Sequence, residues 1–111
     1  MATTARTNPY RDQRTEDLIK EMAGKFLSIE SNRTSLVTVT NINLYNRGKN
    51  VTIFFTVLPE DKEKAVADFT KRKRGEFREY MKDHSRLPII PFVDFELDFG
   101  EKNRQNIDRL I

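Results

Sequence analysis

Two runs of β-branched and aromatic residues, separated by a stretch rich in turn-forming residues, constrain this chain more than any other feature. The first run is LVTVTNINL at 36–44 and the second is VTIFFTVL at 51–58. Between them, YNRGKN contains Asn46 and Gly48, two residue types that tolerate the positive φ angles of a tight turn. The pattern therefore predicts a β-hairpin whose strands bury a common apolar face.

In the first strand of this hairpin, the alternation of apolar and polar residues changes phase part-way along. Val37 and Val39 would lie on one face, whereas Ile42 and Leu44 would lie on the other. One inserted residue reverses the parity of a strand, so a β-bulge at residue 40 or 41 would bring all four side chains to the core. The return strand alternates without interruption, with its apolar residues at Val51, Ile53, Phe55 and Val57.

Helical spacing surrounds the hairpin on both sides. Apolar residues three, four and seven apart predict a helix that is capped by Thr15 and ends near Ile29. After Pro59, a second helix would bury Ala65, Val66 and Phe69. A third would bury Phe77, Tyr80 and Met81, and we expect the two to meet at Gly75. A final strand would point Val93, Phe95, Leu97 and Phe99 inward and end at Gly100.

The predicted order is helix, strand, strand, helix, helix, strand, which places the chain in the α+β class. Each strand offers a single strongly apolar face, so three helices must cover one face of a three-stranded sheet. A chain of 111 residues has the size of one domain. We assign residues 14–100 to that domain, residues 1–13 to a flexible N-terminal arm and residues 101–111 to a C-terminal tail.

Composition excludes several classes of protein. Cysteine is absent, which removes disulfides, thiol nucleophiles and thiolate metal sites. No apolar run approaches the ~20 residues that span a bilayer, and the N-terminal residues lack the apolar core of a secretory signal. We therefore expect a cytoplasmic protein with no membrane partner.

The sequence offers little for catalysis or for metal binding. His84 is the only histidine, and its neighbours Asp83 and Ser85 would point in other directions on a helix, so no triad forms. Asp94, Glu96 and Asp98 could line up along a strand to hold a divalent cation, but alternation alone demands polar residues on a solvated face. We predict no catalytic residues, no metal, no cofactor, no small-molecule substrate and no enzymatic activity.

The densest positive charge in the chain is the run Lys71–Arg74, which directly precedes Gly75. Residues 62–86 carry nine cations against five acids. Cations in the last turn of a helix are stabilised by the negative end of the helix dipole, but this accounts for only one or two of the four cations in the run. A polyanion would relieve the repulsion among the rest. A glycine between two short helices would let the chain bend and let a phosphate approach closely.

The element order and the predicted kink resemble the ribosome-binding factor A family, which has a type II KH-like fold. The resemblance is carried by QRTEDLIKEMAGKFL, by the hairpin VTVTNINLYNRGKNVTIFFTVLPED, by RGEFREYMKDHSRLPIIPFVDFELD and by the ending IDRLI. The family replaces the Gly-x-x-Gly loop of KH domains by an Ala-x-Gly kink. In this chain the corresponding residues are Lys73-Arg74-Gly75, so only the glycine of the Ala-x-Gly motif is present.

The resemblance implies a non-catalytic ribosome biogenesis factor that acts as a monomer. Such a protein would bind the immature 30S small ribosomal subunit through backbone contacts with 16S rRNA and assist the folding and end processing of that RNA. The residues expected to bind RNA are Lys71, Arg72, Lys73, Arg74, Gly75, Arg78 and Arg86. Scattered surface cations form a second group of candidates: Arg11, Arg14, Arg47 and Lys49.

Two alternatives remain open from the sequence. The domain could be a KH-like module that binds another structured RNA, or a protein-interaction domain that docks its basic corner on an acidic partner. Few exposed aromatic residues are expected near the cluster, so base stacking should be minor in either RNA-binding case.

Overall fold

The computed structural model describes residues 9–30 and 35–101 of the chain, with backbone alone for residues 9–12 and 30. The predicted order of elements is confirmed, and one 3-10 turn, η1, precedes the second helix. The elements are α2 (Pro9–Glu30), β1 (Leu36–Tyr45), β2 (Asn50–Leu58), η1 (Glu60–Lys62), α3 (Glu63–Arg72), α4 (Arg74–His84) and β3 (Phe92–Leu97).

The three strands form one mixed sheet in the order β1-β2-β3. β1 and β2 are the antiparallel arms of the predicted hairpin, whereas β3 runs parallel to β2 at the edge of the sheet. The turn holds Asn46, Arg47 and Gly48 at φ angles of 55°, 57° and 82°. Asn46 and Gly48 fulfil the expectation, and Arg47 adopts a left-handed conformation that its residue type did not indicate.

The bulge in β1 is confirmed. The pairing with β2 shifts between Val39 and Asn41, so Thr40 is the inserted residue. Val39 then pairs with Phe55 and Ile42 pairs with Ile53, which places apolar residues from both halves of β1 on the face that β2 buries.

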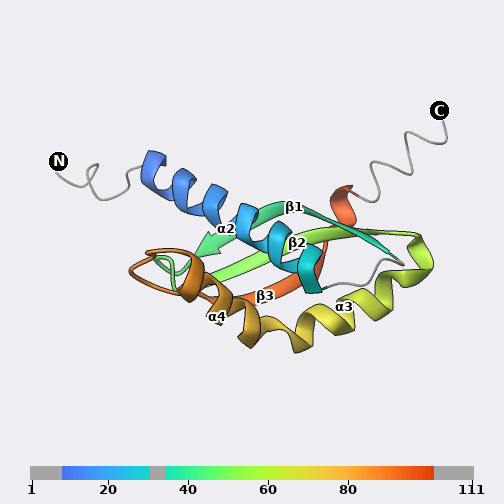
Figure 1. The fold of residues 1–111 in the computed structure, drawn as a ribbon. Coiled ribbons are helices and arrows are strands. Elements are labelled where there is room, and N and C mark those ends of the chain that lie inside the picture. The colour runs from blue at the N-terminus through green and yellow to red at the C-terminus, as the bar shows by residue number, and fades with distance from the viewer. Residues whose placement is uncertain (1–8, 31–34, 102–111) are drawn as a thin grey trace.

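One face of the sheet carries the core. Figure 1 shows α2 lying across the sheet, with α3 and α4 along the side that β3 occupies. The largest fully buried side chains include Phe55 and Phe95 from the sheet, Ile19 from α2 and Phe77 from α4. The Phe77 ring lies 5.2 Å from that of Phe26 and 5.8 Å from that of Phe95. These aromatic contacts fix α4 between α2 and β3.

The first helix begins earlier than the sequence indicated. α2 starts at Pro9 rather than at Thr15, so residues 9–13 belong to the helix and not to the arm. Proline suits the first position of a helix because the amide it lacks would have no partner there. The rest of the predicted arm, residues 1–8, and residues 102–111 of the predicted tail lie outside the described residues.

The last strand ends earlier than predicted. β3 stops at Leu97, and a helical turn begins at residue 99. Asp98 caps this turn, because its Oδ1 accepts a hydrogen bond of 2.9 Å from the amide of Glu101. The Thr40 hydroxyl at the bulge donates to Asp98 Oδ2 over 2.5 Å. Phe99, which the alternation placed in the core, is therefore 60% exposed.

Candidate nucleic-acid interface

The two central helices meet at Lys73, two residues before the glycine at which we expected the junction. α3 ends at Arg72 and α4 begins at Arg74, while Lys73 has φ −97° and ψ 5°. Its amide donates to the carbonyl of Thr70 over 3.1 Å, a tightened last turn of α3. The Thr70 side chain is fully buried, and its hydroxyl donates to the carbonyl of Ala67 at 2.8 Å. This bond also favours a bend.

Gly75 lies inside α4, so the expectation that it forms the bend is wrong. It is exposed in the first turn of α4. A Cβ added there would meet no other atom within 4 Å. The bend therefore does not require a glycine at this position, although the open space above Gly75 leaves room for a ligand.

Lys71 is engaged by two acids of β3. Its Nζ lies 2.6 Å from Asp94 Oδ1 and 2.8 Å from Glu96 Oε2. Partial burial acts to lower the pKa of Lys71, but the hydrogen bonds with the two carboxylates hold it above its ordinary value. Burial likewise acts to raise the pKa of Asp94, and the hydrogen bond from Lys71 brings it below its ordinary value. The acids expected on a solvated face thus fasten α3 to the edge strand.

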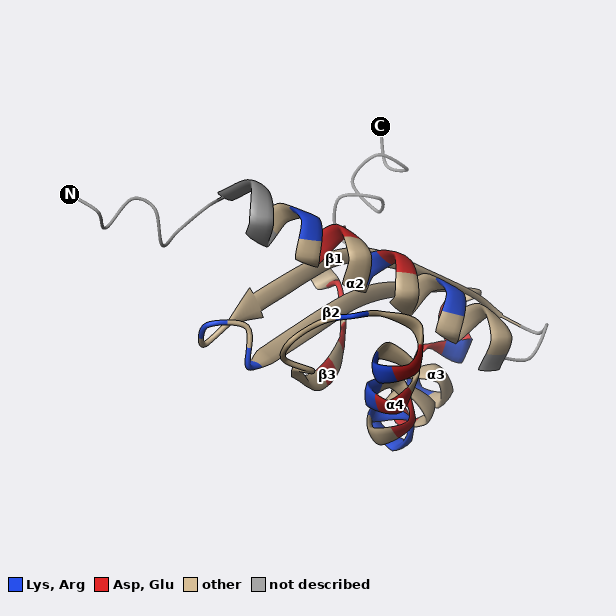
Figure 2. Cartoon of the chain, turned by 60° about the vertical axis from the view of Figure 1, so that its left-hand side comes forward, with Lys and Arg blue, Asp and Glu red and all other residues tan. Residues whose placement is uncertain are grey.

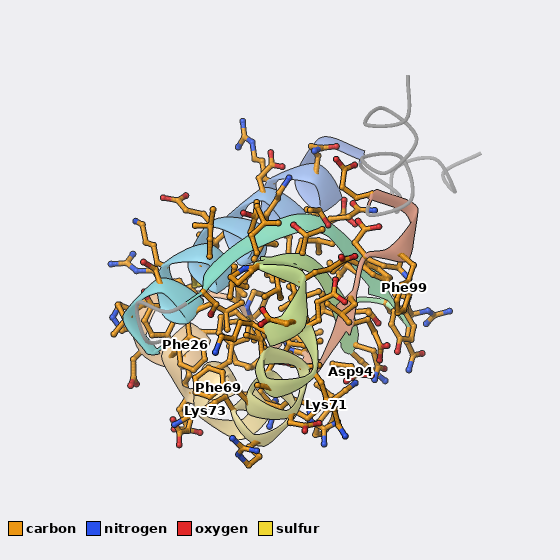
Figure 3. The ribbon with its side chains drawn as sticks, turned by 90° about the vertical axis from the view of Figure 1, so that its right-hand side faces the viewer. Phe26, Phe69, Lys71, Lys73, Asp94 and Phe99 are labelled. Carbon is orange, nitrogen blue, oxygen red and sulfur yellow. The ribbon has the colours of Figure 1, made fainter. Side chains whose placement is uncertain are left out.

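Lys73 points to the opposite side of α3 from Lys71. Figure 3 shows Lys71 beside Asp94 on the side toward β3, and Lys73 beside Phe69 on the side toward Phe26. The Lys73 ammonium lies 5.6 Å from the centroid of the Phe69 ring and 3.1 Å from Glu76 Oε2. Its alkyl stem covers apolar surface at the bend while its charge stays near water.

Arg72 and Arg74 are the most available cations of the run. Both are exposed, and no hydrogen bond or ion pair joins Arg72 to any residue that the structure describes. Arg74 donates from Nε to the carbonyl of Lys71 at 3.0 Å, and its Nη1 lies 3.7 Å from Asp94 Oδ1. Its guanidinium is therefore held at the bend, between the Lys71 carbonyl and Asp94.

The expectation that the cations of the run Lys71–Arg74 repel one another without compensating acids is thus corrected. Asp94, Glu96 and Glu76 offset part of the charge of the run, and Figure 2 shows red interleaved with blue on α3 and α4. Nine cations of residues 62–86 face seven acids once Asp94 and Glu96 are included. The surface remains net positive, and within the run Lys71–Arg74 the exposed cations are Arg72 and Arg74. We call these two residues and the adjacent start of α4 the basic corner.

The other two predicted site residues, Arg78 and Arg86, are not part of the basic corner, although Arg78 lies one turn after Arg74 on α4. The Arg78 guanidinium donates to the carbonyls of Pro91 and Ile90 at 3.0 and 2.9 Å, so it supports the connector before β3. Arg86 is exposed on that same connector. Of the second group, Arg14, Arg47 and Lys49 are exposed, and the Arg11 side chain lies outside the described part of the chain.

His84, the acidic residues and the helices are the candidates for sites of other kinds. His84 stacks on Tyr80 with the ring centroids 4.0 Å apart, and its Nδ1 lies 2.9 Å from the Tyr80 carbonyl. Within residues 9–30 and 35–101, no three acidic or histidine side chains gather as metal ligands. Across the same residues, no helix is both long enough and apolar enough to cross a membrane.

The sequence model described as ribosome-binding factor A matches residues 11–111. The chain belongs to the ribosome-binding factor A family. Among proteins of that name, the one from Staphylococcus saprophyticus is 27% identical over 106 residues, which cover 90% of this chain and 93% of that protein. The one from Clavibacter michiganensis is 30% identical over 104 residues, which cover 91% of this chain and 63% of that protein.

Solved structures show the same fold. The crystal structure of ribosome-binding factor A from Thermus thermophilus superposes with a TM-score of 0.68 at 15% identity, covering 77% of this chain and 92% of that one. A Thermotoga maritima protein solved by NMR gives a TM-score of 0.62 at 19% identity, covering 76% and 83% of the two chains. This chain thus has the same type II KH-like fold as these two structures, and its break between α3 and α4 falls at Lys73.

Proposed function

We propose that this protein is a non-catalytic factor that binds the immature 30S subunit through the backbone of 16S rRNA. It acts as a monomer in the cytoplasm, and it assists the folding and end processing of that RNA. Membership of the ribosome-binding factor A family supports ribosome binding. The basic corner supports the backbone contacts, because guanidinium groups bind phosphate oxygens with good geometry.

The observation that carries this proposal is the exposure of Arg72 and Arg74 beside the first turn of α4. No side chain caps the start of α4, and the first amides of a helix lack partners within it. A phosphate near Gly75 would meet these amides and both guanidinium groups at once. An extra negative charge would also be accepted there without displacing Lys71 from its two carboxylates.

The first test reverses the charge of the basic corner. The double variant R72E/R74E should no longer co-sediment with small ribosomal subunits, because it places two carboxylates where phosphates would bind. The matched control is K20E/K25E, which makes the same charge change on the exposed side of α2 and should bind normally. Circular dichroism should show both variants folded. Equal co-sedimentation of the two variants would remove the basic corner from the mechanism.

A second test concerns the RNA itself. Depletion of the protein from its source cell should cause precursor small-subunit RNA with unprocessed ends to accumulate, because the RNA would fold too slowly to be trimmed. Primer extension across both ends of 16S rRNA measures this. Complementation with the wild type should restore mature ends and R72E/R74E should not. Normal ends in depleted cells would contradict a role in maturation.

A further inference from the structure

An exposed aromatic ring marks a second surface, at the end of the sheet where β3 begins. Phe92 is 63% exposed and alternates with Val93, so it faces away from the core. The guanidinium carbon of Arg78 lies 4.3 Å from the centroid of its ring. Because Arg78 is fixed by the carbonyls of Pro91 and Ile90, the ring is supported on one side and open elsewhere.

Across the strands, the outward-facing residues in line with Phe92 are an amide and a second aromatic ring, and along β3 the next outward residue is Asp94, which is paired with Lys71. Asn50 pairs with Phe92 on one side and with Tyr45 on the other, and Tyr45 is 47% exposed. With strands ~4.8 Å apart, the two aromatic residues stand roughly 10 Å apart with Asn50 between them. Asn50 Oδ1 accepts a hydrogen bond of 2.9 Å from Asn46, and its Nδ2 has no partner within residues 9–30 and 35–101.

The hairpin turn at the end of this row carries positive charge. Arg47 and Lys49 are exposed in the hairpin turn, and neither forms an ion pair with any described residue. The turn adjoins the ring directly, because the Phe92 amide donates to the carbonyl of Lys49 at 2.9 Å. In Figure 2 the turn between β1 and β2 carries blue without red. An aromatic platform beside unpaired cations is the combination that binds single-stranded nucleic acid.

We propose that Phe92 is a stacking site for an unpaired base of RNA, with Lys49 and Arg47 holding the flanking phosphates. The proposal rests on the function proposed above and adds a second contact on the outward face of β3, two residues before the Asp94 that lies beside Arg74. Asn50 Nδ2 is placed to donate to the edge of the stacked base. The cations favour RNA over an apolar peptide, because a peptide would gain nothing from the two free charges. From the sequence we expected base stacking to be minor. The proposal assigns it to one residue, Phe92.

The direct test uses tryptophan fluorescence. The chain contains no tryptophan, so F92W introduces a single tryptophan at the platform, which can be excited selectively over the tyrosines. Titration with a short single-stranded oligoadenylate should quench it, because a stacked base contacts the indole. The control is F99W, at a position of similar exposure, 60%, beyond the other end of β3. F99W should not respond. Equal responses, or no response from F92W, would overturn the proposal.

Affinity for the same oligoadenylate separates stacking from apolar contact. F92A and F92L should each weaken binding about tenfold, since loss of one stacked base typically costs ~1–3 kcal/mol, and F92Y should restore it. R47Q/K49Q should also bind more weakly and with a shallower salt dependence. Wild-type affinity in F92A would overturn the proposal. Normal binding by F92L would do the same, because it would show that an apolar side chain suffices and that no aromatic stacking is needed.

The two proposals can fail separately. Co-sedimentation of R72E/R74E with small subunits reports on the basic corner and leaves Phe92 unchanged. If that variant loses binding while F92A and F92L retain wild-type affinity for oligoadenylate, the stacking site alone is wrong. If the wild type does not bind small subunits, the proposed function is wrong whatever the oligoadenylate shows.

Discussion

At the scale of single residues, two glycines of this chain differ in what they do for the backbone. Gly48 has φ 82° in the hairpin turn, a conformation that side chains rarely adopt. Gly75 stands in the first turn of α4, where a Cβ would meet open space. The backbone therefore requires glycine at position 48 and not at position 75, and the role proposed for Gly75 is to leave room for a phosphate.

Alanine substitutions test this difference. G75A should raise the free energy of unfolding by about 0.5 kcal/mol, because alanine restricts the unfolded chain and favours a helix. Its affinity for small subunits should fall, because the new methyl group stands where a phosphate would approach. G48A should lower the free energy of unfolding by about 1 kcal/mol through backbone strain. Urea unfolding and co-sedimentation measure the two effects. A G75A variant that loses stability would make Gly75 structural.

At the scale of elements, the link between α3 and β3 holds the bend in place. Lys71 is bound by Asp94 and Glu96, and Arg74 lies beside the same Asp94. These ion pairs join the end of α3 to the outward side of the edge strand, while Phe77 holds the start of α4 in the core. The basic corner is therefore displayed by two helices whose meeting point is fixed from both sides.

The pH dependence of stability tests this link. K71M should lower the free energy of unfolding by roughly 0.5–1 kcal/mol at neutral pH, since the pairs are part-exposed. The pKa of Asp94 is below its ordinary value of 3.8. The contribution of Asp94 to the free energy of unfolding is therefore fully present above its ordinary pKa, and it is lost as the pH falls through the lowered pKa of the folded state. The pKa of Lys71 is above 10.5, so the contribution is also lost as the pH rises past it.

Urea unfolding at a series of pH values provides the measurement. The difference between wild type and K71M should shrink in strong acid. The control is K25M, which removes an exposed pair within α2, 3.2 Å from Glu21, and should cost at most about 0.5 kcal/mol. A difference for K71M that stays constant from neutral pH to strong acid would show that Lys71 stabilises by packing and not by charge.

At the scale of the whole molecule, the features that could be predicted from the sequence are those that a local residue pattern determines. The broken parity of β1 indicated a bulge, and Thr40 provides it. Local pattern could not show that Asp98 leaves the alternation to cap a helical turn. It also could not show that Lys71 meets Asp94 and Glu96, which are 23 and 25 residues away. Charge counted along the chain therefore overstated the free charge of the basic corner, because folding brought acids to it.

In the proposed function, positive charge at the bend between α3 and α4 neutralises phosphates of 16S rRNA. The salt dependence of affinity for small subunits tests it most directly, because each phosphate contact adds ~0.7–0.9 to the log–log slope. R72Q/R74Q should bind more weakly with a slope reduced by about 1.5, and K20Q/K25Q should keep the wild-type slope. An unchanged slope for R72Q/R74Q would contradict the account.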